Sequence, residues 1–328
     1  MSVTNDPLAE GSDILADEDP GSGLRSRRVR FPGYDTQVGP LGHLADERRR
    51  LDALEWQHFD VHRLAATVGA ELRGVDLTAQ LADPVIEEIR GALVDYKVLF
   101  FREQPLTAEE HVRFARRFGD LEVHPFIPSN TGQPELVRFA KSADVGGYEN
   151  GWHHDVTWRA EPSQGAILHA IEVPRTGGDT LFADAHAAWQ GLDDETKATI
   201  AELVAVHDYM QAFANQVPPD KVDETRAAYP PVEHPVVCRH PRSGKELLYV
   251  NRFFTSHIAG WELDESRALI DRLSRQFDQV EYQCRFQWEP HSVAFWDNRA
   301  VQHYAASDYW PDTRVMERAS IIGDRPAR

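Results

Sequence analysis

The sequence lacks several features that would assign it to common classes of protein. Among its 328 residues there are only two cysteines, too few for a disulfide framework in a chain of this size. No stretch approaches the roughly twenty apolar residues of a membrane-spanning helix. The acidic start, Met1 to Asp19, has no apolar region of the kind that a signal peptide requires. We therefore expect a protein of the cytoplasm, where thiols stay reduced, with no membrane partner.

Basic residues are scarce relative to acidic ones. The chain has 35 Lys and Arg against 53 Asp and Glu, which gives a formal net charge of −18 at pH 7. Because proteins bind phosphate backbones largely through clustered Lys and Arg, this balance argues against a nucleic-acid partner. We expect a small molecule as the partner instead, and a homo-oligomeric assembly, either a dimer or a tetramer.

Apolar residues are numerous enough for a folded domain. They make up 41% of the chain, with eight Trp and fifteen Phe, enough for a substantial buried core. From Met1 to about Pro40, however, Gly, Pro, Ser, Asp and Arg dominate, and such a segment buries too little apolar surface to offset the entropy of ordering. We predict a flexible tail over residues 1–55, with a short helix from Ala45 to Trp56, and one folded domain over residues 56–328.

Both helices and strands are expected in this domain. Asp83 followed by Pro84 is typical of a helix start, and Thr107 with Glu110 has the spacing of a capping box. The predicted helices cover Val85 to Tyr96, Ala108 to Phe118, Asp194 to Val206 and Asp264 to Phe277. The predicted strands are Val98 to Arg102, Leu136 to Ala140, Ala166 to Val173, Thr180 to Ala183, Leu247 to Asn251, Val280 to Trp288, Val293 to Trp296 and Val315 to Ile322. Many short strands with a few outer helices indicate a mainly β fold with α, a double-stranded β-helix (jelly roll) core decorated by helices.

A first pair of candidate metal ligands lies in Trp152-His153-His154-Asp155. Residues two apart on extended backbone point to the same face, so His153 and Asp155 can converge on one ion while His154 points away. In a chain with fifteen His and many Asp this spacing also arises by chance. The pair alone therefore leaves a structural interpretation open.

A third candidate, His303, ends the segment Trp296 to His303, which follows a predicted strand. Together with His153 and Asp155 it would complete two imidazoles and one carboxylate, the facial triad that leaves positions open on non-haem Fe(II). A single histidine is more often a hydrogen-bonded structural residue. The sequence does not show that the three residues meet.

Two arginines give independent support to a site. Arg314 and Arg318 are four apart, which on a strand places both side chains on one face, toward the inside of a barrel. Burying an unpaired guanidinium is costly, so each needs an anion. A dicarboxylate and an acidic substrate would supply the anions, and structural salt bridges would do so equally well.

Four motifs, taken in order, resemble those of the taurine and 2,4-dichlorophenoxyacetate dioxygenase family, and most closely its taurine-like branch. They are Gly151 to Trp158, Gly177 to Phe182, Trp296 to Tyr304 and Arg314 to Asp324. The resemblance extends from about Val68 to Pro326. It implies an Fe(II)- and 2-oxoglutarate-dependent dioxygenase that uses O₂ and releases succinate and CO₂.

The resemblance also implies roles for single residues. His153, Asp155 and His303 would hold the metal, and Thr180 and Arg314 would hold the distal carboxylate of 2-oxoglutarate. A guanidinium with a hydroxyl donor suits such a planar group.

In the taurine-like branch the substrate sulfonate is bound by residues that match His124 and Arg318, with phenylalanines that match Phe213 and Phe254 around the substrate. The resemblance therefore implies a small anionic substrate, a sulfonate such as taurine or an alkyl sulfate. We expect its tetrahedral anion to receive bonds from His124 and Arg318 with no protein carboxylate nearby.

The sequence departs from the taurine-like pattern at two positions, where Glu149 replaces an asparagine and Ile127 a tyrosine. Both changes argue against taurine itself. If Glu149 lines the pocket, it favours a substrate with a cationic or neutral far end; if it faces solvent, it has no such effect.

Three alternatives stay open at this point. The same chemistry could act on a carboxylate or phosphonate substrate. A zinc hydrolase could use the same triad with a bound water, although Thr180 and Arg314 would then have no role. A non-catalytic jelly-roll binding module would not require three convergent ligands.

Overall fold

The computed structural model describes residues 14–17, 26–30, 37–38, 41–124, 129–130, 132–147 and 149–328. The chain forms two compact units, Met1–Ala53 and Leu54–Arg328. In the first unit, strands β1 (Ile14–Asp17), β2 (Ser26–Arg30) and β3 (Gln37–Val38) form an antiparallel sheet, and helix α1 (Gly42–Asp52) follows them. This helix begins and ends earlier than the predicted Ala45 to Trp56. The predicted division into residues 1–55 and 56–328 stays a prediction.

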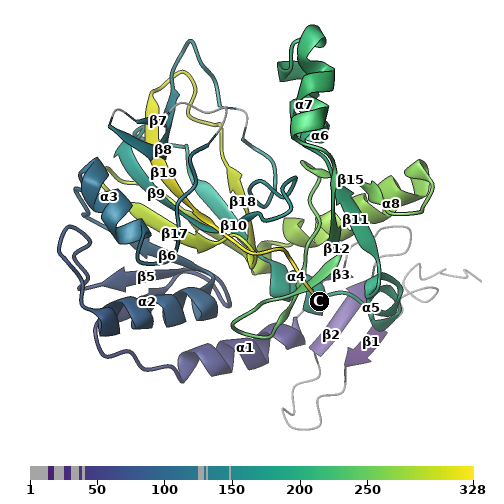
Figure 1. Cartoon of the computed structure of the whole chain (residues 1–328). Coiled ribbons are helices and arrows are strands. Elements are labelled where there is room, and N and C mark those ends of the chain that lie inside the picture. The colour runs from purple at the N-terminus through teal and green to yellow at the C-terminus, as the bar shows by residue number, and fades with distance from the viewer. Residues whose placement is uncertain are drawn as a thin grey trace, which may run out of the picture. The chain divides into compact units, whose positions relative to one another are not determined.

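The second unit contains an eight-stranded sheet (Figure 1). In spatial order its strands are β4 (Asp60–Arg63), β5 (Ala70–Arg73), β6 (Val98–Phe101), β17 (Val293–Asp297), β9 (Ser163–Glu172), β19 (Arg314–Ile322), β8 (Gln133–Lys141) and β7 (Ser129–Asn130). All neighbours are antiparallel except β5 and β6. Strands β6 and β17 are buried along their whole length, as expected for continuous apolar runs covered on both faces.

A three-stranded sheet shares its core with this large sheet. Its order is β16 (Gln283–Phe286), β10 (Thr180–Asp184) and β18 (Val301–Ala305). Phe100 of β6 stacks on Phe286 of β16 with ring centroids 4.0 Å apart, and Phe182 of β10 lies 5.8 Å from Trp296 of β17. Between β9 and β19 the chain passes repeatedly from one sheet to the other, so segments far apart in sequence meet across one core.

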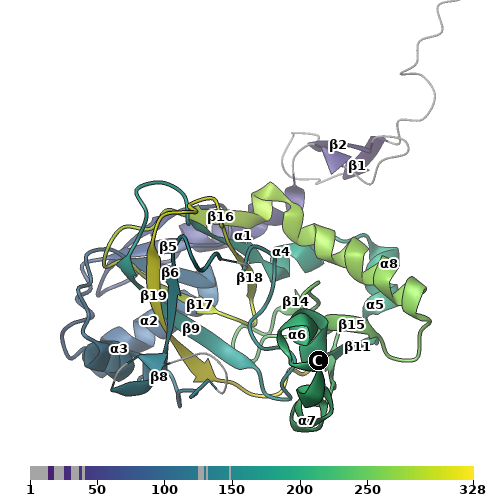
Figure 2. The same cartoon turned by 90° about the horizontal axis from the view of Figure 1, so that it is seen from above.

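The second unit has further strands and helices beside these two sheets. A third sheet has the order β12 (Val232–Pro235), β11 (Val204–His207) and β15 (Thr255–Ile258), and β13 (Val237–Arg239) pairs with β14 (Glu246–Leu248). The helices are α2 (Asp83–Tyr96), α3 (Ala108–Ala115), α4 (Ala185–Gln190), α5 (Asp194–Ile200), α6 (Tyr209–Phe213), α7 (Val222–Ala228) and α8 (Leu263–Ser274). Helices α2 and α3 contact the large sheet, and α8 contacts β15 (Figures 1 and 2).

The structure confirms the expected mixture of sheets and outer helices and corrects several boundaries. The capping box of Thr107 and Glu110 is confirmed, but its helix ends at Ala115, before the predicted Phe118. The helix predicted over Asp194 to Val206 is wrong in its second half, because α5 ends at Ile200 and the alternately buried residues of β11 pair with β12 and β15.

The strand predicted over Val280 to Trp288 is shorter than expected. Only Gln283–Phe286 is a strand, since its neighbour β10 pairs with these four residues alone, and Val280–Tyr282 forms a 3₁₀ turn. The alternation of apolar and polar residues therefore extends beyond the four residues that pair with β10.

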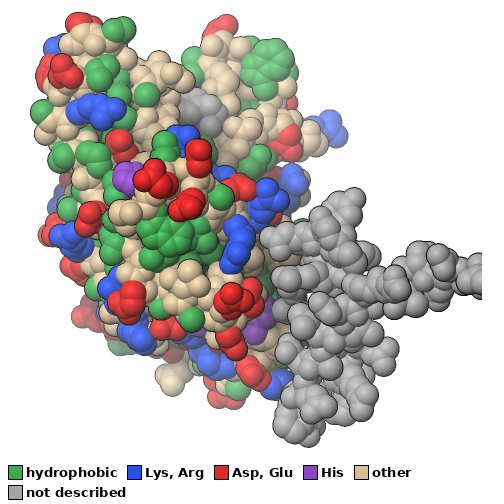
Figure 3. Space-filling model, turned by 90° about the vertical axis from the view of Figure 1, so that its right-hand side faces the viewer, with side chains coloured by type: hydrophobic (Ala, Val, Ile, Leu, Met, Phe, Trp, Pro, Cys, Tyr) green, Lys and Arg blue, Asp and Glu red, His purple; other side chains and the backbone are tan. Residues whose placement is uncertain are grey.

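Two features of the described residues bear on partners. No helix among them is long and apolar enough to cross a membrane. On the face shown in Figure 3, the blue Lys and Arg side chains are interspersed with red Asp and Glu.

A buried ion pair links the large sheet to the smaller one. Lys97, directly before β6, is 2% exposed, and its Nζ lies 3.2 Å from Oδ2 of Asp184 at the end of β10. Thr67 donates its hydroxyl to the same carboxylate oxygen at 2.8 Å, and its carbonyl accepts from Lys97 Nζ at 2.7 Å. The charged groups are thus paired and hydrogen-bonded, as burial requires.

We expect Lys97→Met to lower the free energy of unfolding by about 3–5 kcal/mol, because it leaves a buried carboxylate without its cation. Lys221→Met is the control, since Lys221 pairs with Glu224 at the surface, where a bridge contributes about 0–1 kcal/mol. Urea denaturation of both variants measures the difference. Equal small losses in the two would contradict a structural role for the buried pair.

Candidate active site

The two candidate histidines are joined through their backbones. The amide of His153 donates to the carbonyl of His303 at 3.1 Å, and the amide of His303 donates to the carbonyl of His153 at 2.9 Å. His303 lies on β18, which pairs with β10, so this bridge fixes the loop that carries His153 against the smaller sheet. Their ring centroids are consequently only 4.2 Å apart.

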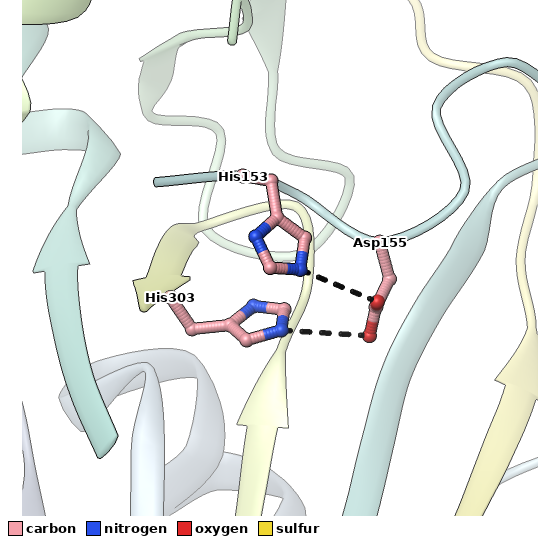
Figure 4. Close-up of side chains that lie close together, drawn as sticks. All are labelled: His153, Asp155 and His303. Atoms are coloured by element: carbon pink, nitrogen blue, oxygen red, sulfur yellow. Dashed lines mark ion pairs between the residues drawn. The ribbon is translucent and has the colours of Figure 1, made fainter. Parts of the chain in front are cut away.

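Asp155 completes a cluster with these two rings (Figure 4). The Nε2 atoms of His153 and His303 lie 3.9 and 3.8 Å from the two oxygens of Asp155, and one ligand atom from each residue lies within 4.8 Å of the others. All three side chains are buried. Gly151 offers its carbonyl to Nδ1 of His153 at 2.7 Å, which orients the ring with Nε2 toward Asp155. His154 points the other way and packs on Tyr249, as the spacing predicted.

The backbone of Asp155 is held by a residue that sequence reasoning missed. The amide of Asp155 donates to Oδ1 of Asn298 at 2.7 Å, and Nδ2 of Asn298 donates back to the carbonyl of Asp155 at 3.0 Å. Asn298 lies inside the motif that ends at His303, so its position in that motif was the available signal. The next residue, Val156, has φ +49°, an unfavourable conformation for a β-branched side chain.

The charges around Asp155 favour metal binding. Burial acts to raise the pKa of Asp155, but Arg318, His303 and His153 together hold that pKa well below its usual range. Burial, with the neighbouring His153, holds the pKa of His303 well below its ordinary value. An ionised carboxylate beside a neutral imidazole is the protonation state that metal ligation requires. Two imidazoles and one carboxylate on one side also match the donor set of non-haem Fe(II) sites.

Arg318 differs from the sequence expectation. Its Nη1 donates to both oxygens of Asp155, at 3.0 and 2.9 Å, so the expectation that no protein carboxylate lies nearby is wrong. The cause is the shared burial of the two side chains, since an ionised carboxylate in the protein interior requires a cation. The ring of Phe139 lies 5.1 Å from the guanidinium carbon.

The buried guanidinium of Arg314 lies beside Thr180. Arg314 is 7% exposed, and it donates through Nε to the carbonyl of Gly178 at 3.1 Å and through Nη2 to the hydroxyl of Thr180 at 3.4 Å. Within the described part of the chain, no carboxylate forms an ion pair with it. Because an unpaired buried cation is unfavourable, this end of the site suits a carboxylate supplied by a ligand.

Trp288 holds the hydroxyl of Thr180 in place, and sequence reasoning missed it. Its Nε1 donates to the Thr180 hydroxyl at 3.0 Å. With bonds from Trp288 and Arg314 already accepted, the hydroxyl of Thr180 keeps its own hydrogen to donate to a ligand.

The candidate metal, cosubstrate and substrate residues open onto one cavity of roughly 350 Å³. Its lining includes the nine residues to which the sequence assigned a role in binding metal, cosubstrate or substrate, namely His124, His153, Asp155, Thr180, Phe213, Phe254, His303, Arg314 and Arg318. Burial, Arg318 and Arg159 lower the pKa of His124 to about 4, so its imidazole is neutral at pH 7. Ile127 lies outside the described residues.

One side of the cavity is aromatic. We call Trp158, Tyr209, Phe213, Phe253 and Phe254 the aromatic wall, and all five line the cavity. Phe253, which sequence reasoning missed, lies over His153 with ring centroids 5.0 Å apart and an interplanar angle of 30°. Its position next to Phe254 was the only signal in the sequence.

Glu149 also lines the cavity, and its charge is paired. Nζ of Lys141 lies 3.0 Å from Oε1 of Glu149, and both side chains belong to the lining. Lys141 had not been singled out in the sequence. The carboxylate therefore does not present an uncompensated negative charge to a ligand.

Comparison with known proteins agrees with this geometry. Residues 60–320 match the family described as taurine catabolism dioxygenase TauD, TfdA family. The chain belongs to this family. It is therefore a 2-oxoglutarate-dependent non-haem iron dioxygenase, which uses Fe(II), 2-oxoglutarate and O₂.

Individual relatives of this dioxygenase are similar over most of their length. It is 36% identical to an alpha-ketoglutarate-dependent sulfate ester dioxygenase from Pseudomonas putida over 82% of this chain and 91% of that protein. It is 34% identical to an alkylsulfatase from Acinetobacter baylyi over 82% of this chain and 86% of the relative. The crystal structure of a taurine dioxygenase from Burkholderia xenovorans superposes with a TM-score of 0.72 at 36% identity, covering 82% of this chain and 91% of that one.

The assignment of the three metal ligands can be tested by substitution. We expect His153→Ala, Asp155→Ala and His303→Ala each to abolish turnover and to weaken Fe(II) binding by more than about 100-fold, beyond the 10–100-fold effect of losing a supporting residue. Anaerobic titration with Fe(II) measures the affinity. His124→Asn, which alters the cavity but not the triad, serves as the control and should bind Fe(II) like the wild type. Full activity in any triad variant would contradict the assignment.

The end of the site near Thr180 makes a second prediction. Arg314→Ala should raise the KM for 2-oxoglutarate by about tenfold or more, because it removes charge-assisted bonds of about 1.5–3 kcal/mol, and should leave the substrate KM nearly unchanged. Thr180→Ala should act in the same direction but more weakly. Trp288→Phe, which removes only the indole donor to Thr180, should have the smallest effect. A wild-type KM for 2-oxoglutarate in Arg314→Ala would show that another cation binds this ligand.

Proposed function

We propose that this dioxygenase oxidises a small substrate with an anionic sulfate or sulfonate head group and an apolar body, an alkyl sulfate ester in the first instance. The observation that carries the proposal is the cavity itself. It is lined by the cationic Arg318 and the neutral His124 beside the triad, with the aromatic wall along one side. The relatives named as a sulfate ester dioxygenase and an alkylsulfatase support the same substrate class.

In this proposal the triad of His153, Asp155 and His303 holds Fe(II), and Arg314 with Thr180 holds the distal carboxylate of 2-oxoglutarate. When bound, Fe(II), 2-oxoglutarate and O₂ supply the oxidising power that places a hydroxyl on the substrate, with succinate and CO₂ as co-products. The support for the second assignment is that the buried Arg314 lines the cavity and donates to Thr180, with no carboxylate partner among the described residues.

In this proposal Arg318 interacts with two anions, the Asp155 carboxylate and the head group of the substrate. Without a metal its guanidinium neutralises Asp155. Once a divalent cation supplies that neutralisation, the N–H donors of Arg318 can turn to the head group of the substrate, because a guanidinium offers several donors in one plane. His124 adds a neutral donor beside it. A tetrahedral anion with several acceptor oxygens suits this pair.

The rest of the lining selects the body of the substrate. Phe213, Phe253 and Phe254 offer apolar surface next to the triad. Glu149 is paired with Lys141, so the cavity gives no special advantage to a cationic far end. We therefore infer an alkyl or aryl body rather than the amine of taurine. A carboxylate or phosphonate head group is the alternative with the same chemistry.

Hydroxylation of the carbon that bears the sulfate oxygen has a defined outcome. The hydroxylated ester breaks its C–O bond to sulfate, and an aldehyde and sulfate result. The chain contributes orientation, since a head group held by Arg318 and a body held by Phe254 place the intervening carbon near the triad. The aromatic wall also excludes water from this carbon.

We also propose that the two sheets with a common core form a double-stranded β-helix. The support is the alternation along the chain, in which β9, β17 and β19 belong to the large sheet and β10, β16 and β18 to the smaller one. A cytoplasmic location and a homo-oligomer stay predictions.

The proposed head-group contact is tested with matched substrates. Arg318→Ala should lower kcat/KM for hexyl sulfate by about tenfold or more, since it removes a charge-assisted bond of about 1.5–3 kcal/mol, and should change kcat/KM for uncharged 1-hexanol far less. Arg318→Lys should recover part of the loss. Fe(II) affinity measured in parallel separates this effect from the loss of the Asp155 partner. An equal loss on both substrates would mean that Arg318 serves Asp155 alone.

A further inference from the structure

Behind the cavity surface, a buried hydrogen-bond network joins the loop of the metal ligands to the aromatic wall. The loop contributes Thr157, two residues after Asp155, and the wall is approached by Asn251, three residues before Phe254. Both Thr157 and Asn251 are fully buried, with 0% of their surface exposed. Neither was singled out in the sequence.

The side chain of Asn251 bonds to both sides. Its Nδ2 donates to the hydroxyl of Thr157 at 3.2 Å, and its Oδ1 accepts the backbone amide of Phe254 at 2.9 Å. Because a backbone amide can only donate, the bond to Phe254 fixes which end of the Asn251 amide is the oxygen. The backbone amide of Asn251 in turn donates to the hydroxyl of Thr255 at 3.0 Å. The amide group of one side chain is thus the link between the two segments.

In the loop of the metal ligands, hydrogen bonds hold the residues on both sides of Val156, whose backbone is strained. Val156 with its positive φ lies between Asp155, which Asn298 holds, and Thr157, which Asn251 holds. Nδ1 of His207 lies 2.9 Å from the same Thr157 hydroxyl. Such a backbone conformation persists only when surrounding contacts impose it. We therefore expect a displacement of Asp155 to move Thr157 as well.

We propose that Thr157 and Asn251 are positioning residues that couple occupancy of the metal site to the order of the aromatic wall. A metal that fixes Asp155 fixes Thr157, and through Asn251 it fixes the amide of Phe254. Since such coupling is reciprocal, a substrate body seated on Phe254 strengthens metal binding by the same factor. This inference rests on the proposed triad, and it does not depend on which substrate the dioxygenase uses.

Direct packing is the competing route between the same two segments. Val156 and Trp158 belong to the same buried cluster as Phe254. Packing survives the loss of one hydroxyl, whereas the proposed link does not. A substitution confined to the Thr157 hydroxyl therefore separates the two routes.

The test compares four forms of the full chain. Thr157→Val removes the hydroxyl, and Thr157→Ser keeps it. Thr67→Val is the matched control, because it removes another buried threonine hydroxyl bond, the one to Asp184, outside the cavity lining. If Thr157→Val does not fold, Thr157→Ala removes the same hydroxyl and replaces it in the comparison.

Co(II), which takes the same ligands as Fe(II) without turnover, is the probe. Titration first establishes that each form is saturated, and hydrogen exchange of the Phe254 amide is then measured by mass spectrometry with and without Co(II). In the wild type, Thr157→Ser and Thr67→Val, Co(II) should slow this exchange by about fivefold or more, the lower end of typical coupling between sites. In Thr157→Val, still loaded with Co(II), the slowing should fall below about twofold, close to the value of one that uncoupled sites give.

The outcomes separate the inference from the proposed function. A wild type that does not bind Co(II) overturns the triad and the inference together. A wild type that binds Co(II) without slower exchange at Phe254 overturns the coupling and leaves the triad intact. Slowing that persists in Thr157→Val shows that packing carries the coupling and overturns the role of the hydroxyl and of Asn251.

Discussion

The site depends on keeping one buried carboxylate ionised. Asp155 is almost fully enclosed, and a lone carboxylate in such surroundings would take up a proton. Arg318 prevents this by donating to both oxygens, and the imidazoles of His153 and His303 face the same group. In the proposed function, this carboxylate would bind the metal, and the bound metal would free the Arg318 guanidinium for a second anion.

Strand β19 places a second buried cation in the same cavity, some distance along the strand from Arg318. Arg314 and Arg318 lie four apart on β19, so the same strand supplies one cation to each end. At one end Arg314 has Thr180, itself held by Trp288, and no carboxylate among the described residues. At the other end Arg318 has Asp155 and the aromatic wall nearby. We therefore propose that a dicarboxylate cosubstrate binds near Arg314 and that an anionic substrate with an apolar body binds near Arg318.

The site residues that belong to a motif could be predicted from the sequence. Those that only the fold brings to the site could not. The spacing of His153 and Asp155 predicts a shared face, and the structure places His303 beside them because β18 and the ligand loop exchange two backbone bonds. Phe253, Lys141 and Asn251 carry no motif, since their role depends on neighbours that are distant in sequence.

The ends of elements failed for a related physical reason. Helical periodicity continued past Ile200 into residues that pair with two other strands, because no local signal reports a distant pairing partner. The contact of Arg318 with Asp155 was missed in the same way. Each arginine was expected to need an anion, but the anion that Arg318 contacts comes from the metal-ligand loop.

We propose that the enzyme oxidises the ester and does not hydrolyse it. The most direct measurement is the identity of the organic product from hexyl sulfate in the presence of Fe(II), 2-oxoglutarate and O₂. We expect hexanal, sulfate and succinate in equal amounts, with none of them formed when 2-oxoglutarate is left out. Hexanol and sulfate formed without 2-oxoglutarate would contradict this proposal, because they are the products of a metal-activated water attacking the ester.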